Sequence, residues 1–187
     1  MKLLAVVATD KELAALVREL ATEPLTVGPY RGCRTATTDL VVAGIGPAAA
    51  AAGTATALAL ASYDLCLSLG ICGAYRGTAE IGDTVVATGL VAADLGADSP
   101  EGFLGTGALG WADDVATVDP TLVQTVAHRL GDVVTGPVLT VSTVTGTRAR
   151  ADVLGGRYGA VAEAMEGWGV LTAALPHSLP VVEVRTV

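Results

Sequence analysis

Short apolar runs alternate along this chain with helical segments, and this order constrains the fold more than any other feature. The runs expected to form strands are Leu3–Ala8, Asp39–Ala43, Leu65–Leu69, Asp83–Thr88, Gly89–Ala93, Val138–Val144, Ala160–Ala164 and Val181–Val187. The expected helices are Asp10–Leu20, Pro47–Ala61, Pro120–Leu130, Arg148–Leu154 and Met165–Leu175. Strands alternating with helices predict a layered α/β sandwich around a largely parallel sheet. The near-continuous apolar strands are typical of strands covered on both faces.

The length and charge of the chain limit its class and its partners. A chain of 187 residues favours a single domain spanning residues 1–187. Its 11 basic and 19 acidic residues give a net charge of −8 without a basic patch, which argues against nucleic-acid and anionic-membrane partners. No apolar stretch reaches the about 20 uninterrupted residues that a membrane-spanning helix needs. The N-terminus lacks the features of a signal peptide, so we expect a cytoplasmic protein.

The cysteines indicate neither a disulfide framework nor a metal site. Cys33, Cys66 and Cys72 are odd in number and form no CxxC pair. Cys66 and Cys72 lie in apolar, strand-like sequence. We therefore expect both to be buried, reduced thiols.

The last apolar run, Val181–Val187, reaches the end of the sequence. A central strand normally continues into a loop and a covering helix. We therefore expect the single domain to lack its C-terminal loop and helix in this chain.

Two glycine-rich turns follow apolar runs. Gly44-Ile-Gly-Pro-Ala-Ala49 matches the dinucleotide fingerprint G-x-G-x-x-G/A, which leaves open a nucleotide-cofactor-binding oxidoreductase of the Rossmann type. The acidic residue expected about 20 positions later is absent, because Asp64 precedes the next strand. In Ser68–Ala74, Gly70 and Gly73 either permit a sharp turn or let the backbone approach a planar ligand closely.

Two acidic segments lie at the ends of predicted strands. Thr9-Asp-Lys-Glu12 is a capping box, and Glu12 also lies just beyond the first strand, at the edge where open α/β sheets bind ligands. Glu163-Ala-Met-Glu-Gly167 joins a short strand to a helix. One reading is that its acidic side chains are stabilised by the dipole of the helix that they precede. The other is that the segment binds a sugar, with Met165 lying flat on the ring and Glu166 accepting hydrogen bonds from two hydroxyl groups.

Two further features carry no motif but need an explanation. Arg185 places a charge in an apolar strand, where it requires a partner. The segment Gly96–Trp111 is rich in glycine and polar residues and is long for a loop. Loops of this length are often functional.

Taken in order, these segments resemble the nucleoside phosphorylase superfamily, most closely its nucleosidase branch, which includes the methylthioadenosine/S-adenosylhomocysteine nucleosidases. The segments that carry the resemblance are Leu4–Leu16, Val42–Gly46, Leu69–Gly73, Ile81–Val86, Thr140–Gly146, Val161–Gly167 and Val181–Val187. Within the superfamily, the sequence looks most like the futalosine hydrolases of menaquinone biosynthesis, because of Ala93–Ala97, Ser99–Phe103 and Val141–Thr147. The resemblance implies a three-layer α/β/α sandwich with a central mixed, largely parallel, twisted sheet.

The resemblance also implies a chemistry without cofactor or metal. It implies hydrolysis of the N-ribosidic bond of futalosine, releasing hypoxanthine and dehypoxanthine futalosine. Such cleavage passes through an oxocarbenium-like sugar cation, which a nearby carboxylate stabilises. Glu12 matches the general base for water, Glu166 the carboxylate on the ribose hydroxyls and Met165 the side chain packed on the sugar. Arg185 matches an arginine close to the sugar.

The resemblance assigns the remaining substrate contacts. The other substrate-binding positions are Ile45, Ile71, Cys72, Gly73, Phe103, Thr143 and Val144. Phe103 and Trp111 belong to the futalosine-type segment and would contact the aromatic side of the substrate. Futalosine carries a benzoate, for which Arg76 and Arg148 are candidate partners. In this superfamily the acid that serves the leaving purine would lie just beyond Val187. Members form dimers or higher oligomers, so we expect a homo-oligomer.

Several alternatives stay open at this point. Asp10 and Glu12 would repel phosphate, so the sequence favours water as the nucleophile over the chemistry of a purine nucleoside phosphorylase. A methylthioadenosine/S-adenosylhomocysteine nucleosidase is the alternative hydrolase. The oxidoreductase built on Gly44–Ala49 and a ligand-binding relative without turnover are alternatives from other classes.

Overall fold

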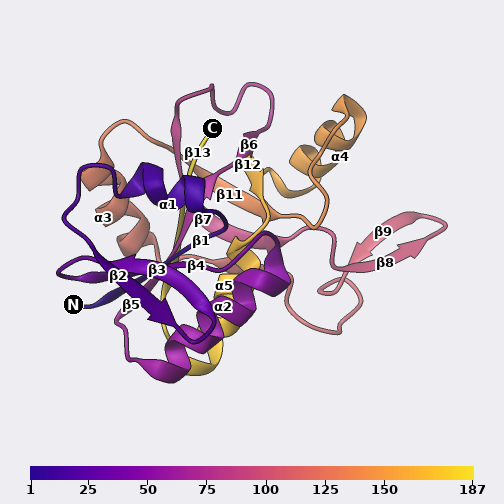
Figure 1. The fold of residues 1–187 in the computed structure, drawn as a ribbon. Coiled ribbons are helices and arrows are strands. Elements are labelled where there is room, and N and C mark those ends of the chain that lie inside the picture. The colour runs from indigo at the N-terminus through magenta and orange to yellow at the C-terminus, as the bar shows by residue number, and fades with distance from the viewer.

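The computed structural model describes residues 1–187 as one large mixed sheet with helices on both faces, beside a separate hairpin (Figure 1). The strands are β1 Leu3–Val7, β2 Glu23–Val27, β3 Tyr30–Arg34, β4 Thr38–Val42, β5 Leu65–Ile71, β6 Gly73–Ala74, β7 Thr84–Ala92, β8 Gly96–Ser99, β9 Gly102–Gly105, β10 Val115–Thr117, β11 Val134–Thr140, β12 Ala162–Ala164 and β13 Val181–Thr186. The helices are α1 Asp10–Leu16, α2 Pro47–Leu60, α3 Pro120–Leu130, α4 Arg148–Tyr158, α5 Gly167–Ala174 and the 3₁₀ turn η1 Leu175–His177. The predicted α/β class is confirmed. None of these helices has the length and apolar character needed to cross a membrane.

Side chains of β1 point alternately to the two faces of the sheet, and each face has its own helical cover. Leu4 lies in the main core with Ala50 of α2 and Val170 of α5. Ala5 points the other way and belongs to a second core, against which Leu13 of α1 packs. Burial on both faces explains why this strand is apolar at every position.

The strand order explains how distant segments meet. It runs β2-β3-β4-β1-β5-β13-β7-β11-β12-β6, with β10 paired to β7. The pairs among β4, β1, β5 and β13 are parallel, whereas β7 runs antiparallel to β13. Only Cys72 separates β5 from β6, yet β6 pairs with β12 at the far end of the order, with Gly73 opposite Glu163. The chain runs from β5 directly into β6, so the strands β5, β13, β7, β11, β12 and β6 form a closed ring. This closure brings Cys72 beside β12.

Several element boundaries differ from the expected ones. The first helix ends at Leu16 instead of Leu20, and the two runs expected at 83–93 form the single strand β7. The helix α4 continues to Tyr158 and ends at Gly159, whose left-handed backbone, with a φ of 57°, is typical of a helix C-cap. The hairpin of β2 and β3 was not predicted, since its residues show little apolar alternation.

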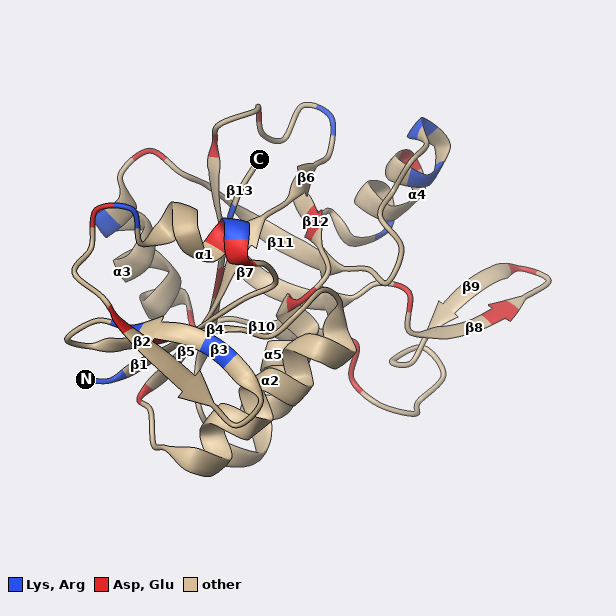
Figure 2. Ribbon diagram, in the orientation of Figure 1, with Lys and Arg blue, Asp and Glu red and all other residues tan.

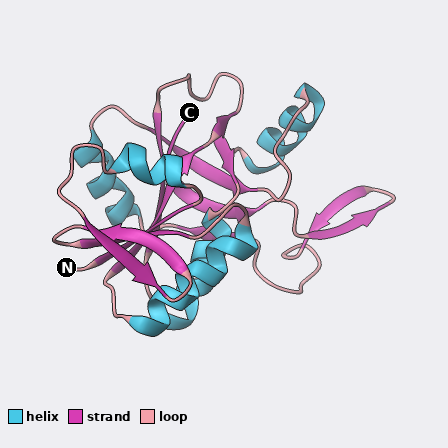
Figure 3. Cartoon of the chain, in the orientation of Figure 1, coloured by secondary structure: helices cyan, strands magenta, loops and turns pink.

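The segment Gly96–Trp111 is not the continuous loop that the sequence suggested. Its first half forms the hairpin of β8 and β9, which pair only with each other and project from the body of the molecule (Figure 3). Gly96 lets the two strands approach, since a Cβ atom there would overlap the backbone oxygen of Leu104. Gly102 follows the two-residue turn as the first residue of β9, with a φ of 114°, a conformation that favours glycine.

Candidate active site

A cavity of about 400 Å³ lies where the loops that follow β1, β4, β5 and β12 converge. It is lined by Ala8, Thr9, Glu12, Ile45, Ile71, Cys72, Gly73, Val141, Val144, Glu163, Ala164, Met165 and Glu166. Most of its wall is apolar, yet three carboxylates, Glu12, Glu163 and Glu166, reach it. No lysine or arginine side chain lines it. Such a cavity suits a ligand that is partly apolar, carries hydroxyl groups and develops positive charge.

Glu12 reaches the cavity from the first turn of α1, where acidic and basic residues gather (Figure 2). Its Oε2 atom accepts hydrogen bonds from the backbone N–H of Thr9 at 2.9 Å, from the Thr9 hydroxyl at 2.9 Å and from Ala8 N at 3.2 Å. The backbone N–H of Glu12 donates to Thr9 Oγ1 in return, so the predicted capping box is present. Oε1 accepts only from Ile71 N, at 3.1 Å. Because a carboxylate oxygen offers about two acceptor positions, one position on Oε1 has no partner in the protein.

Glu166 lies at the start of α5 and is held by the turn that begins α2. Its Oε1 atom accepts a 3.1 Å hydrogen bond from Gly46 N, and Oε2 accepts from Met165 N at 3.3 Å. Gly46 is the N-cap residue of α2, with a φ of 93°. A carboxylate of the protein itself therefore occupies the helix N-terminus at which a Rossmann fold would bind a pyrophosphate. The fingerprint-like turn Gly44–Ala49 serves Glu166, not a dinucleotide.

Arg185 does not line the cavity but lies behind Glu166, fully buried on β13. Its Nη1 atom is 3.2 Å from Glu166 Oε2, Nε donates to Glu183 Oε1 at 2.8 Å and Nη2 donates to Ser68 Oγ at 2.8 Å. Burial alone opposes the charge of the guanidinium, but Glu183 and Glu166 outweigh it and raise the pKa of Arg185. Burial raises the pKa of Glu183, and Arg185 counteracts that rise. Arg185 has the partners that its charge requires and orients Glu166 from behind.

Gly70 is required by this network. A Cβ atom at Gly70 would overlap Glu12 Oε1 and would lie 2.7 Å from Arg185 Nη1. At Gly73 the nearest atom to such a Cβ is Glu163 Cγ, at an ordinary contact distance of 3.8 Å. Gly70 is therefore needed because the side chains of Glu12 and Arg185 pack directly against its backbone.

Glu163 is the site residue to which sequence reasoning gave no role. It is 6% exposed, lies on β12 and lines the cavity together with Cys72, Gly73 and Val144. Three donors surround its carboxylate, two from Thr145 and one from the hydroxyl of Tyr75. Its only sequence signal was an acid in a short apolar strand immediately before Met165 and Glu166.

The thiol of Cys72 lines the cavity but is not activated. Burial raises its pKa to about 11, and the positive charge of Arg185 lowers that value only in part. Cys66 is buried away from the cavity, and burial raises the pKa of its thiol to about 12. Both cysteines are free thiols, as predicted, but only Cys66 is buried, because Cys72 is partly exposed to the cavity. No group of three or more His, Cys, Asp or Glu side chains could hold a metal ion.

The structure brings together most of the residues that the sequence selected. The residues that line the common cavity are Glu12, Ile45, Ile71, Cys72, Gly73, Val144, Met165 and Glu166. Thr143 is not among the lining residues, and its backbone oxygen accepts a 3.3 Å hydrogen bond from Arg150 Nη2. Arg76 and Arg148 line a different cavity, of about 640 Å³, beside α4.

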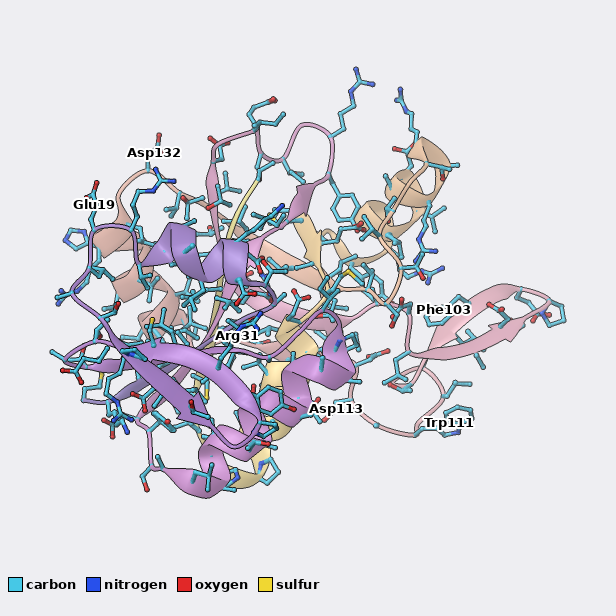
Figure 4. All side chains as sticks on the ribbon, viewed as in Figure 1. Glu19, Arg31, Phe103, Trp111, Asp113 and Asp132 are labelled. Carbon is cyan, nitrogen blue, oxygen red and sulfur yellow. The ribbon has the colours of Figure 1, made fainter.

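Phe103 and Trp111 also do not line the cavity that contains Glu12 and Glu166. Figure 4 shows both on the side of the molecule from which β8 and β9 project. Phe103 lines a separate hollow against α4, and its ring centroid is 5.2 Å from the guanidinium carbon of Arg157. Trp111 is 69% exposed.

Comparisons with known proteins show the family and the fold of the chain. The sequence pattern of the Phosphorylase superfamily matches residues 2–187. The futalosine hydrolase of Acidothermus cellulolyticus is 45% identical, over 100% of this chain and 79% of that protein. The futalosine hydrolase of Streptomyces coelicolor is 48% identical, over 80% of this chain and 66% of that protein. The crystal structure of the Streptococcus pneumoniae methylthioadenosine/S-adenosylhomocysteine nucleosidase with the transition-state inhibitor MT-ImmA has the same fold, with a TM-score of 0.84 and 24% identity over 100% of this chain and 84% of that one.

The fold and the sequence together define the class: the chain belongs to the phosphorylase superfamily. The Rossmann-type oxidoreductase that Gly44–Ala49 left open is therefore wrong. Within the superfamily, the chain belongs to the futalosine hydrolases, a family of hydrolases that act on N-glycosyl bonds.

Proposed function

We propose that this chain hydrolyses the N-ribosidic bond of futalosine and releases hypoxanthine. The observation that carries the proposal is that Glu12 and Glu166 face one cavity of about 400 Å³ together with Met165. In this assignment Glu166 accepts hydrogen bonds from the ribose hydroxyls and Met165 packs on the sugar. Cys72, Gly73 and Val144 form the end of the cavity that takes the base. The names of the relatives support futalosine as the substrate.

Glu12 is the general base in this proposal. Four donors fix its carboxylate, and the free acceptor position of Oε1 is available to a water molecule. A water that donates to Oε1 has its oxygen lone pair directed away from the carboxylate, toward the sugar. As the bond to the base breaks, positive charge grows on the sugar, and the charges of Glu12 and Glu166 stabilise it.

Water is favoured over phosphate as the nucleophile by the charge of the site. A phosphorolytic site needs cationic groups that contact the anion, and none lines this cavity. The guanidinium of Arg185 does not line the cavity and already contacts Glu166 and Glu183. Three carboxylates at one cavity would also repel a dianion.

The test is the release of free bases by the purified protein. Futalosine, methylthioadenosine and inosine are incubated with and without phosphate, and the products are separated by chromatography. We expect hypoxanthine from futalosine at a rate that does not depend on phosphate. Base release that requires phosphate and yields ribose 1-phosphate would overturn the proposal, as would a clear preference for methylthioadenosine.

The protein is also proposed to act as a homodimer or higher homo-oligomer, as the superfamily resemblance suggests. Light scattering coupled to size-exclusion chromatography measures the mass directly. A monomer of 18.6 kDa would contradict this part of the proposal.

A further inference from the structure

Glu163 is a buried acid of the catalytic cavity that has no part in the mechanism described above. It lies on β12, opposite Gly73 of β6, and lines the cavity together with Cys72 and Gly73. A Cβ atom added at Gly73 would come 3.8 Å from Glu163 Cγ, so the two residues are direct neighbours. The proposed function places the base against Cys72 and Gly73, and a base at that position therefore lies beside Glu163.

The partners of Glu163 leave part of its carboxylate unused. Oε1 accepts from Thr145 N at 2.7 Å, and Oε2 accepts from Thr145 Oγ1 at 2.6 Å and from the Tyr75 hydroxyl at 2.8 Å. A carboxylate offers about four acceptor positions, so one position, on Oε1, has no donor from the protein. Buried polar groups are normally satisfied, which makes this position a candidate for a donor on the ligand.

The surroundings also define the character of the group. Every neighbour donates, and burial together with the hydrogen bond to Glu163 raises the pKa of Tyr75, so that its hydroxyl keeps its proton. No lysine or arginine pairs with Glu163, so the charge of the carboxylate is not neutralised locally. A neutral N–H donor of the ligand would therefore form a charge-assisted hydrogen bond with it.

We infer that Glu163 is a specificity-determining residue that accepts a hydrogen bond from the N1–H of a 6-oxopurine and thereby selects hypoxanthine over adenine. A 6-oxopurine carries a hydrogen on N1, whereas a 6-aminopurine presents a lone pair there. The carboxylate attracts the first and repels the second. This inference rests on the proposed function, since it takes the base to lie at the Cys72–Gly73 end of the cavity.

The test compares two substrates that differ only in the base: futalosine and the same nucleoside with adenine in place of hypoxanthine. The ratio of their kcat/KM values is measured for the unmodified protein, Glu163→Gln and Glu163→Met. We expect the unmodified protein to prefer hypoxanthine, and the ratio to fall by about 10- to 100-fold in Glu163→Met. In Glu163→Gln we expect a smaller fall, because the amide oxygen still accepts but carries no charge.

Tyr75→Phe is the matched control, because it removes a partner of Glu163 and leaves the carboxylate in place. We expect it to lower the rates for both substrates alike and to leave their ratio unchanged. If the Glu163 variants also leave the ratio unchanged, Glu163 only anchors Thr145 and Tyr75, and the inference is wrong.

Calorimetric binding of free hypoxanthine and free adenine gives a readout that does not need turnover. Tighter binding of hypoxanthine that is weakened in Glu163→Gln and lost in Glu163→Met supports the inference even where the variants are slow. Equal affinity for both bases in the unmodified protein overturns it and leaves the nucleosidase proposal standing. Release of no base from any nucleoside would instead contradict the proposed function.

Discussion

The Nη1 atom of Arg185 lies 3.2 Å from the Oε2 atom of Glu166, and both side chains are buried. The same guanidinium contacts Glu183, whose second oxygen, Oε2, has no hydrogen-bond partner. One buried cation thus compensates two buried anions. Because Arg185 lies behind Glu166, the only charged side chains that line the cavity are carboxylates. This arrangement gives the cavity the negative charge that a sugar cation requires and keeps the arginine away from the reacting atoms.

Removing this arginine should be costly for the fold. Arg185→Met leaves Glu166 and Glu183 buried without a counter-charge, and we expect the free energy of unfolding to fall by about 3–5 kcal/mol. Urea denaturation at neutral pH measures it. The control is Arg148→Met, which removes an exposed i,i+4 pair with Asp152 and should cost no more than about 0.5 kcal/mol. Equal losses in the two variants would show that the buried network contributes little to stability.

Asp39 should make the stability of the fold sensitive to acid. Its side chain is 1% exposed, and hydrogen bonds from Arg34, outweighing the effect of burial, lower its pKa from 3.8 to about 2, with help from Tyr63 and Lys2. Because the pKa is lower in the folded state, the unfolded chain binds the proton first as the pH falls. The contribution, about 2 kcal/mol, is present above about pH 4 and is lost as the pH falls toward about 2.

Asp39→Asn should therefore lower the stability at neutral pH and flatten its decline between about pH 4 and pH 2. Denaturation midpoints measured at several pH values test this. Asp132→Asn changes an exposed acid, labelled in Figure 4, and should leave the profile as it is. An unchanged acid profile in Asp39→Asn would contradict the assignment.

Gly70→Ala should damage the site more than it damages the fold. The added methyl group would overlap Glu12 Oε1 and would lie 2.7 Å from Arg185 Nη1, so Arg185 must shift and Glu12 must leave its position opposite Ile71 N. We expect kcat to fall by about 100-fold or more, because a displaced general base loses its contribution. Steady-state kinetics measures kcat, and circular dichroism checks that the protein is folded.

Gly156→Ala is the control for this substitution. Gly156 lies in α4, and a Cβ atom added there would have no neighbouring atom within 4 Å. Alanine at this position should therefore be neutral or stabilise the helix by up to about 1 kcal/mol. A Gly70→Ala protein as active as Gly156→Ala would show that Glu12 does not need its observed position.

The sequence predicted the five α-helices, the central strands around the cavity and most of the residues that line it, because these depend on local patterns, but it did not predict the hairpins of β2 with β3 and of β8 with β9. The capping box at Thr9 and Glu12 and the Met165-Glu166 pair are each contained in a few adjacent residues. Glu163 could not be assigned in the same way. Its role depends on the ring closure that pairs β6 with β12, and on Tyr75, which lies 88 residues away in sequence.

The position of Phe103 could not be predicted from local sequence patterns either. The glycine-rich segment predicted a loop, but β8 and β9 pair with each other, and Phe103 packs toward α4 instead of the cavity. Hairpin pairing within a polar segment depends on a close backbone approach at Gly96 and a positive φ at Gly102, and neither appears as an apolar alternation.

The two proposed catalytic carboxylates should respond differently to neutralisation. Glu12→Gln keeps the shape of the side chain but removes the base, so we expect kcat to fall by about 10²–10⁴-fold with little change in KM. Glu166→Gln removes charge next to the ribose while Arg185 stays behind it, so both kcat and KM should suffer. Steady-state kinetics with futalosine distinguishes the two patterns. Glu19→Gln, at an exposed position labelled in Figure 4, is the control and should match the unmodified protein. A Glu12→Gln protein that retains more than about a tenth of the original kcat would rule out Glu12 as the general base.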